Sequence, residues 1–318
     1  MNGPSPAVLE VAPLVAAELE AARALTFPAY RPRLEAALEQ RAPAPGWQTG
    51  VLGARCQGSL TGLLLYSLVP ETDGCRRVLL HSLAVQPAWR RQGQGLALLA
   101  ALEAALPRPG RYCLEASYTT RMPGWRGFEA CLERAGWPQT QPGLLLARAH
   151  GGVLAAPWVT PGLPLPEGFE FFPWSGLTGA EASSLEAELE RGDIPRGLSP
   201  FAEARDLEPE VSVGIRAQGR VVAWMTVLRS PLMPDALCYR SLFVRPGLRM
   251  GRRLGPLALA EAIRRHLGGP LARERPLGVF GISRSEGRKM LNFFERRLLP
   301  YCFEQHESRL ARKELTPV

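Results

Sequence analysis

The sequence predicts an α/β protein built from two similar domains in tandem. One observation is local: a strand, a basic glycine-rich turn and an Ala/Leu-rich helix follow one another between Val78 and Leu106. The other covers the whole chain, because stretches around this segment return 159 to 162 residues later, which indicates a duplicated domain. A chain of 318 residues, 46% of them hydrophobic, is long enough to form two packed cores.

The repeat has three parts in the same order, and a proline-rich segment separates its two copies. Pro157–Gly168 contains four prolines, so we predict a linker at residues 157–168 between domains at residues 1–156 and 169–318. The repeated pairs are Gly53–Gly58 with Gly214–Gly219, Leu80–Pro87 with Tyr239–Pro246, and Phe128–Trp137 with Met290–Leu299.

In the first copy, apolar runs and turn residues predict the elements in order. Gln57-Gly58-Ser59 lies between two apolar runs and predicts a β-hairpin. Pro87 ends the strand before the glycine-rich turn, because proline cannot donate to a sheet ladder, and Gly136 is placed to end a helix. The predicted strands are Val8–Val11, Gly50–Cys56, Leu60–Val69, Val78–Val85, Arg111–Tyr118 and Leu144–Arg148, and the helices are Leu14–Leu25, Arg33–Arg41, Leu96–Leu106 and Phe128–Ala135.

The second copy predicts a similar succession of elements. Its predicted strands are Phe169–Phe172, Val211–Ala217, Val221–Leu228, Leu237–Val244, Leu277–Ile282 and Phe303–Leu310, and its predicted helices are Glu181–Glu190, Arg253–Leu267 and Lys289–Leu298.

The glycine-rich turn of the first copy has the properties of a pyrophosphate site. Gly93 and Gly95 have no Cβ, so the backbone can turn sharply and approach a ligand closely. The helix follows at once, and its first N–H groups, together with the helix dipole, favour an anion. Arg90 and Arg91 add positive charge at the same place.

Arg90-Arg91-Gln92-Gly93-Gln94-Gly95, following the strand end Val85-Gln86-Pro87, resembles motif A of the GNAT superfamily of acyl-CoA N-acyltransferases. That motif reads (Arg/Gln)-x-x-Gly-x-(Gly/Ala). Together with the repeat, the resemblance implies two tandem GNAT domains, each a mixed, mostly antiparallel sheet flanked by helices. A dinucleotide-binding fingerprint fits less well, because it needs three spaced glycines and a later acidic residue.

The resemblance also implies the cosubstrate, which is acetyl-CoA or a longer acyl-CoA, with no metal. In this family the acceptor amine attacks the thioester directly, so the protein must supply positioning, a proton acceptor and a stabilised oxyanion. The residues expected to hold the pantetheine arm through their backbone are Leu83, Ala84 and Val85, and those expected to hold the pyrophosphate are Arg90, Arg91, Gln92, Gly93, Gln94, Gly95 and Leu96.

His81 is the first candidate for the proton acceptor. An alkyl amine has a pKa near 10, so only roughly one molecule in a thousand is neutral near pH 7, and a general base would help. GNAT enzymes commonly place this base on the strand before motif A, where His81 is the one titratable side chain. Glu115, on the next strand, is the second candidate. Either residue can instead be structural, and Glu115 can also bind a cationic acceptor.

The general acid of the family is missing at its usual place. Many GNAT enzymes protonate the leaving thiolate with a tyrosine on the later helix, and the matching residues here are Leu132 and Phe294. Tyr118 and Cys131 are possible substitutes, and a CoA thiolate can also leave without a dedicated acid. For Cys131 the preferred interpretation is a small buried apolar residue.

The second glycine-rich turn is degenerate, which points to the first domain for cofactor binding. The second turn can be aligned with the first in two registers. One places Arg253 at the position of Gly95. The other places Gly255 at the position of Gly93 and Leu257 at the last position of the motif, where Gly95 stands. Arg240 occupies the place of His81, and arginine is not a base at neutral pH. The alternative is that the arginines of this turn bind phosphate with their side chains.

Composition excludes several other classes. No run of about 18 apolar residues predicts a membrane span, and no basic leader followed by an apolar stretch predicts a secretory signal. The six cysteines and four histidines show no metal-ligand spacing, so we expect a reduced, cytoplasmic setting. The net charge of +8 is spread along the chain, which disfavours a nucleic-acid surface.

The sequence therefore predicts an N-acyltransferase that moves an acyl group, most simply acetyl, from acyl-CoA to a primary amine of a small molecule or peptide. One alternative is a GNAT-type enzyme that places a longer fatty acyl group on an amine side chain of a peptide natural product. Another is a non-catalytic acyl-CoA-binding protein, which the missing tyrosine would suit. The sequence does not identify the acceptor, the acyl chain length or the oligomeric state.

Overall fold

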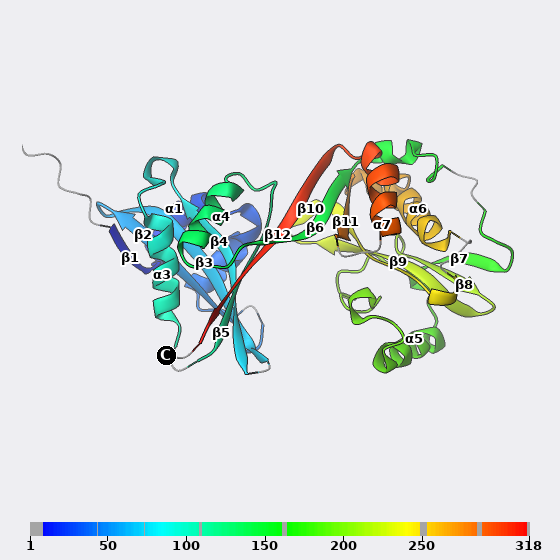
Figure 1. The fold of residues 1–318 in the computed structure, drawn as a ribbon, viewed down its shortest axis with the longest axis horizontal. Helices are drawn as coiled ribbons and strands as arrows, with labels where there is room; N and C mark the ends of the chain where they lie inside the picture. The colour runs from blue at the N-terminus through cyan, green and yellow to red at the C-terminus, as the bar shows by residue number, and fades with distance from the viewer. Residues whose placement is uncertain are drawn as a thin grey trace, which may run out of the picture. The chain divides into compact units, whose positions relative to one another are not determined.

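The fold is described from a computed structural model that covers residues 9–42, 44–72, 74–107, 110–160, 164–248, 253–284 and 288–316. The chain divides into two compact units (Figure 1). Unit 1 comprises the residues up to Gly143 together with those from Glu307 onwards, and unit 2 comprises Leu144–His306. The predicted fold class is confirmed, because the strand pairs of each unit are antiparallel among the described residues except for one parallel pair.

Unit 1 is a sheet in the order β1-β2-β3-β4-β5-β12, in which β4 and β5 run parallel. The hairpin predicted at Gln57-Gly58-Ser59 joins β2 and β3. The strands are β1 Leu9–Pro13, β2 Gln48–Cys56, β3 Ser59–Thr72, β4 Cys75–Val85, β5 Tyr112–Thr119 and β12 Glu304–Leu315, and the helices are α1 Leu19–Leu25, α2 Arg31–Leu38, α3 Gln94–Ala105 and α4 Trp125–Arg134. Val8, predicted to begin the first strand, lies outside the described residues.

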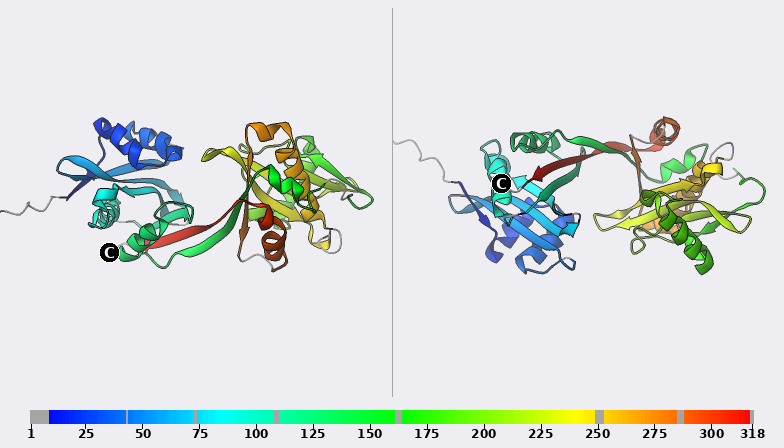
Figure 2. Two further views of the ribbon diagram at one scale, coloured as in Figure 1. Left: turned by 90° about the horizontal axis from the view of Figure 1, so that it is seen from above. Right: turned by 60° about the horizontal axis from the view of Figure 1, so that its bottom comes forward.

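Helices cover both faces of the unit 1 sheet, as Figure 2 shows for α1 and α2 on one side and α3 and α4 on the other. The alternation of side chains along β3 explains this arrangement. Leu64 packs with the core of α3 and α4, whereas its neighbours Leu63 and Leu65 pack under α1 and α2. All three are fully buried, and burial of each stabilises the unit by about 1.5–3 kcal/mol.

Unit 2 repeats this architecture with the sheet order β6-β11-β10-β9-β8-β7, in which β10 and β11 run parallel. All nine elements predicted in the second copy are found, and the last predicted helix continues from α7 as a π-helical turn at Phe294–Leu298. The strands are β6 Gln141–Ala149, β7 Phe169–Pro173, β8 Val213–Ala217, β9 Arg220–Ser230, β10 Met233–Val244 and β11 Leu277–Ser283, and the helices are α5 Gly179–Arg191, α6 Leu254–Leu267 and α7 Arg288–Phe293.

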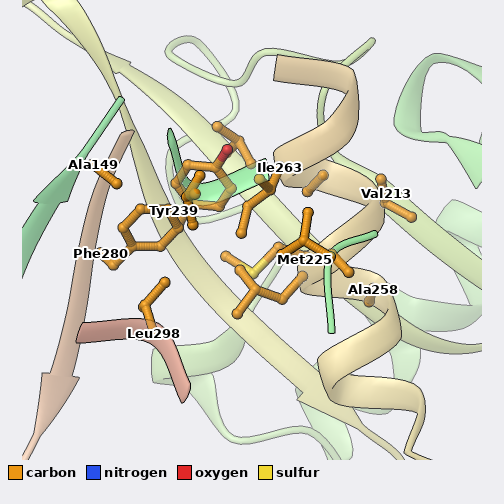
Figure 3. Packing of buried hydrophobic residues seen from close by; sticks show 14 of the residues in the cluster. Ala149, Val213, Met225, Tyr239, Ala258, Ile263, Phe280 and Leu298 are labelled. Atoms are coloured by element: carbon orange, nitrogen blue, oxygen red, sulfur yellow. The ribbon is translucent and has the colours of Figure 1, made fainter. Parts of the chain in front are cut away.

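The main core of unit 2 lies between its sheet and α6 (Figure 3). Tyr239 of β10 and Phe280 of β11 stack with ring centroids 4.2 Å apart. Ala258 and Ile263 of α6 belong to the same core cluster and are fully buried. The parallel strands and the helix that connects them are thereby fixed together, and the glycine-rich turn lies at the start of that helix.

The last strand of each copy completes the sheet of the other unit. β12, at the end of the chain, pairs antiparallel with β5, with Leu315 opposite Tyr112 and Ser308 opposite Thr119. β6, which follows the first copy, pairs antiparallel with β11, with Ala149 opposite Gly278 and Leu144 opposite Ser283. Both strands were predicted, but not this exchange of partners.

The predicted boundary at residues 157–168 therefore does not coincide with the division of the structure, which falls at 143/144 and 306/307. The first residues of the predicted linker pack in unit 2 and do not form a connection between two domains. Val159 is fully buried in the unit 2 core, and its carbonyl accepts a hydrogen bond from Arg264 Nη1 at 2.8 Å. Trp158 Nε1 donates to the carbonyl of Arg297. Residues 161–163 of the predicted linker lie outside the described residues.

Candidate functional site

The two parallel strands of unit 1 separate before either of them ends. β4 and β5 pair from Arg76 opposite Tyr112 to Leu80 opposite Ala116, and the pairing stops there. β4 nevertheless continues to Val85 and β5 to Thr119. The edge of β4 that faces β5 is consequently not paired with that strand over the last residues of β4, so its backbone can bind an extended ligand.

A β-bulge marks the point of separation. On the other edge of β4, Tyr66 lies opposite Leu80 and Leu65 opposite Ser82, so His81 is an extra residue between them. A bulge increases the local twist and re-aims side chains, which is consistent with β4 turning away from β5 here. His81 therefore stands where the strands begin to open.

The predicted pantetheine-binding residues lie on the opened part of β4. Leu83, Ala84 and Val85 are half-buried, and their pairing with β3 continues to the end of the strand. The carbonyl of Val85 accepts a hydrogen bond from Arg90 Nε at 3.0 Å. The side chain of Arg90 thus folds back onto the strand end instead of extending from the turn.

The turn after β4 places the start of α3 beside this opening. Gly93 is the N-cap of α3 in the left-handed region at φ +83°, and a Cβ placed there would meet no atom within 4 Å. The first helical hydrogen bond runs from Ala97 N to Gly93 O, so the N–H groups of Gln94, Gly95 and Leu96 have no acceptor within the helix. An anion can therefore approach the helix start along an open path.

The side chain of Gln94 has a structural role. It is almost fully buried, its Oε1 accepts from Thr61 Oγ1 at 2.9 Å, and its Nε2 lies 3.2 Å from Cys56 Sγ. These contacts tie the start of α3 to β2 and β3. Of the predicted cradle residues, Gln94 can thus offer only its backbone N–H, whereas Arg91 and Gln92 are exposed around the turn.

Gly95 is required by packing between helices. A Cβ on Gly95 would lie 2.9 Å from Sγ of Cys131 on α4, closer than real side chains approach. The second glycine of the motif thus lets α3 and α4 come together beside the opened strands. Cys131 is thereby placed against the first turn of α3, and burial raises the pKa of its thiol.

His81 is held by residues that the sequence analysis did not single out. Its Nε2 lies 3.0 Å from Arg33 Nη1 and 2.8 Å from Ser67 Oγ, and the ring of Tyr30 lies 5.5 Å away. A guanidinium only donates, so Nε2 is an acceptor. Burial and the nearby Arg33 charge lower the pKa of His81 to about 4, so the ring is neutral at pH 7.

Glu115 occupies a different part of the sheet from His81. It lies opposite Leu79, where β4 and β5 are still paired. Its carboxylate forms ion pairs with Arg77 at 2.7 Å and with Arg312 of β12 at 3.3 Å. Burial alone would raise the pKa of Glu115, but its hydrogen bond to Arg77 and the charges of both arginines hold that pKa below its usual value.

The two substitutes for the missing tyrosine both hold their protons firmly, and that of Tyr118 is already donated. Tyr118 Oη donates to Glu129 Oε1 at 2.6 Å, and burial together with this carboxylate raises the pKa of Tyr118. The thiol of Cys131 also has a raised pKa. Leu132, at the place of the family's tyrosine, is buried in the core under α3 and α4.

Unit 2 has the same strand opening and a different turn. β10 and β11 pair only as far as Tyr239 opposite Phe280, and Arg240 is the bulge residue. Arg253, at φ +51°, is the N-cap of α6 and stands where Gly93 stands in unit 1. Gly255 then corresponds to Gly95, so neither register predicted for the second turn is correct. Residues 249–252 of this turn lie outside the described residues.

The face of β10 near its bulge is covered in unit 2. Ser241 Oγ and Trp224 Nε1 both donate to the carbonyl of Leu198, and Trp224 stacks on Phe243 with centroids 4.3 Å apart. Arg240 forms an ion pair with Glu203 at 2.9 Å. The corresponding place in unit 1 holds Arg33 and His81 instead.

Two further classes of site have no support in the part of the chain that the structure describes. None of its helices is long and apolar enough to cross a membrane. The same residues contain no group of three or more His, Cys, Asp or Glu side chains arranged to hold a metal ion.

Comparisons with known proteins agree with this architecture. A tandem GNAT protein from the clavulanic acid biosynthesis pathway, solved without AcCoA, is similar over 98% of this chain and 100% of its own, with 19% identity and a TM-score of 0.61. A GCN5-related N-acetyltransferase from Sphaerobacter thermophilus is similar over 97% and 96%, with 16% identity and a TM-score of 0.59. No curated protein matches the chain.

The fold and the opened strand pairs define a protein with two α/β units in tandem. Residues 16–123, which contain the opening and the glycine turn of unit 1, match the model of the Acetyltransferase (GNAT) family. This segment of unit 1 thus resembles the GNAT family, and over its whole length the chain is similar in fold to the tandem GNAT protein.

Proposed function

We propose that the protein is an acyl-CoA-dependent N-acyltransferase whose working site lies in unit 1. The acyl group is most simply acetyl, and the acceptor is a primary amine of a small molecule or peptide. One observation carries the proposal: the opening between β4 and β5 lies directly beside the open turn at Gly93. Unit 2 lacks this combination, because Arg253 replaces the glycine and Pro256 has no N–H to offer the anion.

The proposed reaction needs little acid–base chemistry from the protein. The amine nitrogen forms a bond to the thioester carbonyl carbon, the C–S bond breaks, and CoA leaves as a thiolate. The contacts of His81 argue against its predicted role as the general base, because Nε2 already accepts from Arg33 and a pKa of about 4 makes the ring a weak base. We therefore propose that the neutral fraction of the amine attacks and that its proton leaves to solvent.

A non-catalytic acyl-CoA-binding protein is the second candidate. Its support is that His81 and Glu115 are both engaged with arginines and that Leu132 replaces the family's tyrosine. Thiol release from acyl-CoA with a panel of amines separates the two functions. The pH profile of that release tests the mechanism: a rise that follows the amine alone supports solvent as the proton acceptor, and an inflection that disappears in His81→Asn restores His81 as the base.

Calorimetric titration with CoA, acetyl-CoA and palmitoyl-CoA tests cofactor binding and acyl chain length together. One equivalent is expected, and two equivalents would make unit 2 a cofactor site as well. Preference for palmitoyl-CoA would favour transfer of a longer fatty acyl group. Binding of none of the three would refute the proposal.

A matched pair of variants tests the location of the site. Gly93→Ala and Gly58→Ala both place a Cβ in open space at positive φ, so each should cost about 1–2 kcal/mol of backbone strain. Only Gly93 lies at the start of α3, whereas Gly58 lies in the β2–β3 turn. Loss of acyl-CoA affinity in Gly93→Ala alone is expected, and an equal loss in both variants would contradict the assignment.

A further inference from the structure

Arg33 is a half-buried cation that has no anionic partner among the residues that the structure describes. Its Nη1 contacts Nε2 of His81, and no carboxylate among the described residues forms an ion pair with it. Glu35, two residues later on α2, pairs with Arg23 instead, and Arg55 pairs with Glu18. A neutral imidazole accepts one of the five guanidinium N–H groups and leaves the charge uncompensated.

The position of Arg33 relates this charge to the strand opening. Arg33 contacts His81, which is the bulge residue where β4 leaves β5. Both faces of the sheet carry a hydrophobic core, one under α3 and α4 and the other under α1 and α2, and Arg33 of α2 reaches the strand opening from the face of α1 and α2. Arg33 lies on that face, and Ser67 and Tyr30 contact the same imidazole.

We propose that Arg33 binds the carboxylate of the acceptor, so that unit 1 acylates amines that also carry a carboxylate. The planar guanidinium fork matches a carboxylate in a bidentate arrangement. His81 positions this fork by accepting from Nη1 without neutralising it. This inference rests on the proposed acyl transfer, and the bonds formed and broken are the same as in that reaction. The carboxylate of the acceptor is bound by Arg33 and does not react.

Matched acceptors test the proposal directly. Each L-amino acid of a panel is compared with its carboxamide, which keeps the amine and removes the charge. The wild-type kcat/KM should favour the carboxylate by about tenfold or more, because a charge-assisted hydrogen bond is worth about 1.5–3 kcal/mol. Arg33→Met should reduce this ratio to about one, and Arg33→Lys should retain part of it.

Arg31→Met is the control, because Arg31 is an exposed arginine two residues earlier on α2. It should leave the ratio unchanged, and all three variants should bind acyl-CoA as the wild type does. A wild-type ratio near one, or a ratio that survives in Arg33→Met, would overturn the proposal. Greater activity on phosphoethanolamine than on the amino acids would overturn the choice of a carboxylate.

A binding measurement separates this proposal from the proposed function. Protein saturated with CoA is titrated with an N-acetyl amino acid and with its amide. If no amine releases thiol, the acyltransferase assignment fails, but Arg33-dependent binding of the N-acetyl amino acid still supports the carboxylate site. Equal binding of acid and amide, or binding that Arg33→Met leaves unchanged, rejects the site whatever the activity.

Discussion

Replacing His81 by asparagine should remove much of the acid sensitivity of unit 1. Burial and the Arg33 charge lower the pKa of His81 from 6.5 to about 4 in the folded protein. Between these values the unfolded state binds the proton and the folded state does not, so stability falls as the pH falls through this window. At 1.36 kcal/mol per pKa unit, the loss is about 2 kcal/mol between pH 7 and pH 5, and about 3 kcal/mol in total.

The assay is chemical denaturation of the wild type and His81→Asn at pH 7, 6 and 5. The variant also loses the contacts to Arg33 and Ser67, but that loss is the same at each pH, so only the slope matters. His266, whose pKa burial also lowers, is present in both proteins and cancels in the difference. Equal pH slopes in both proteins, or an NMR titration of His81 near 6.5, would refute the reasoning.

Three further predictions follow from the backbone and the strand exchange. Gly95→Ala should lower the stability of the protein in thermal denaturation and weaken acyl-CoA binding, because its Cβ would lie 2.9 Å from Cys131 Sγ. Gly255→Ala is the control in unit 2. Its Cβ would meet its nearest atom at 3.5 Å, so this variant should be more stable by up to about 1 kcal/mol from helix propensity. Arg253→Gly should relieve about 1 kcal/mol of left-handed strain at φ +51°, and an unchanged denaturation midpoint would contradict this. Deletion from Glu307 onwards should abolish acyl-CoA binding and promote aggregation measured by light scattering, because it leaves the edge of β5 unpaired.

The turn at Gly93 was predictable because all of its determinants are local. A proline after the strand, two arginines and a glycine at the helix start lie within seven residues, Pro87–Gly93, and each acts through its own backbone or charge. The second turn was misread for a related reason. Arg253 adopts a left-handed conformation that usually favours glycine, so an alignment on glycines places the start of α6 incorrectly.

The environment of His81 was not predictable from local pattern. Arg33 lies 48 residues before His81 in the sequence, on a helix whose sequence carries no sign of the contact. The sequence correctly indicates a titratable side chain at the strand opening. Its pKa, however, depends on burial and on one distant charge, which only the packed structure brings together.

The exchange of strands between the units has the same origin. Leu144–Arg148 and Phe303–Leu310 are recognisable as strands, but alternation of apolar residues predicts a strand without naming its partner. Because β12 completes the sheet of unit 1 and β6 that of unit 2, neither residues 1–156 nor residues 169–318 contain all strands of one unit. A cut at the predicted linker would thus leave each half without one strand that its unit needs. It follows that unit 1 cannot form its complete sheet before the last residues of the chain are present.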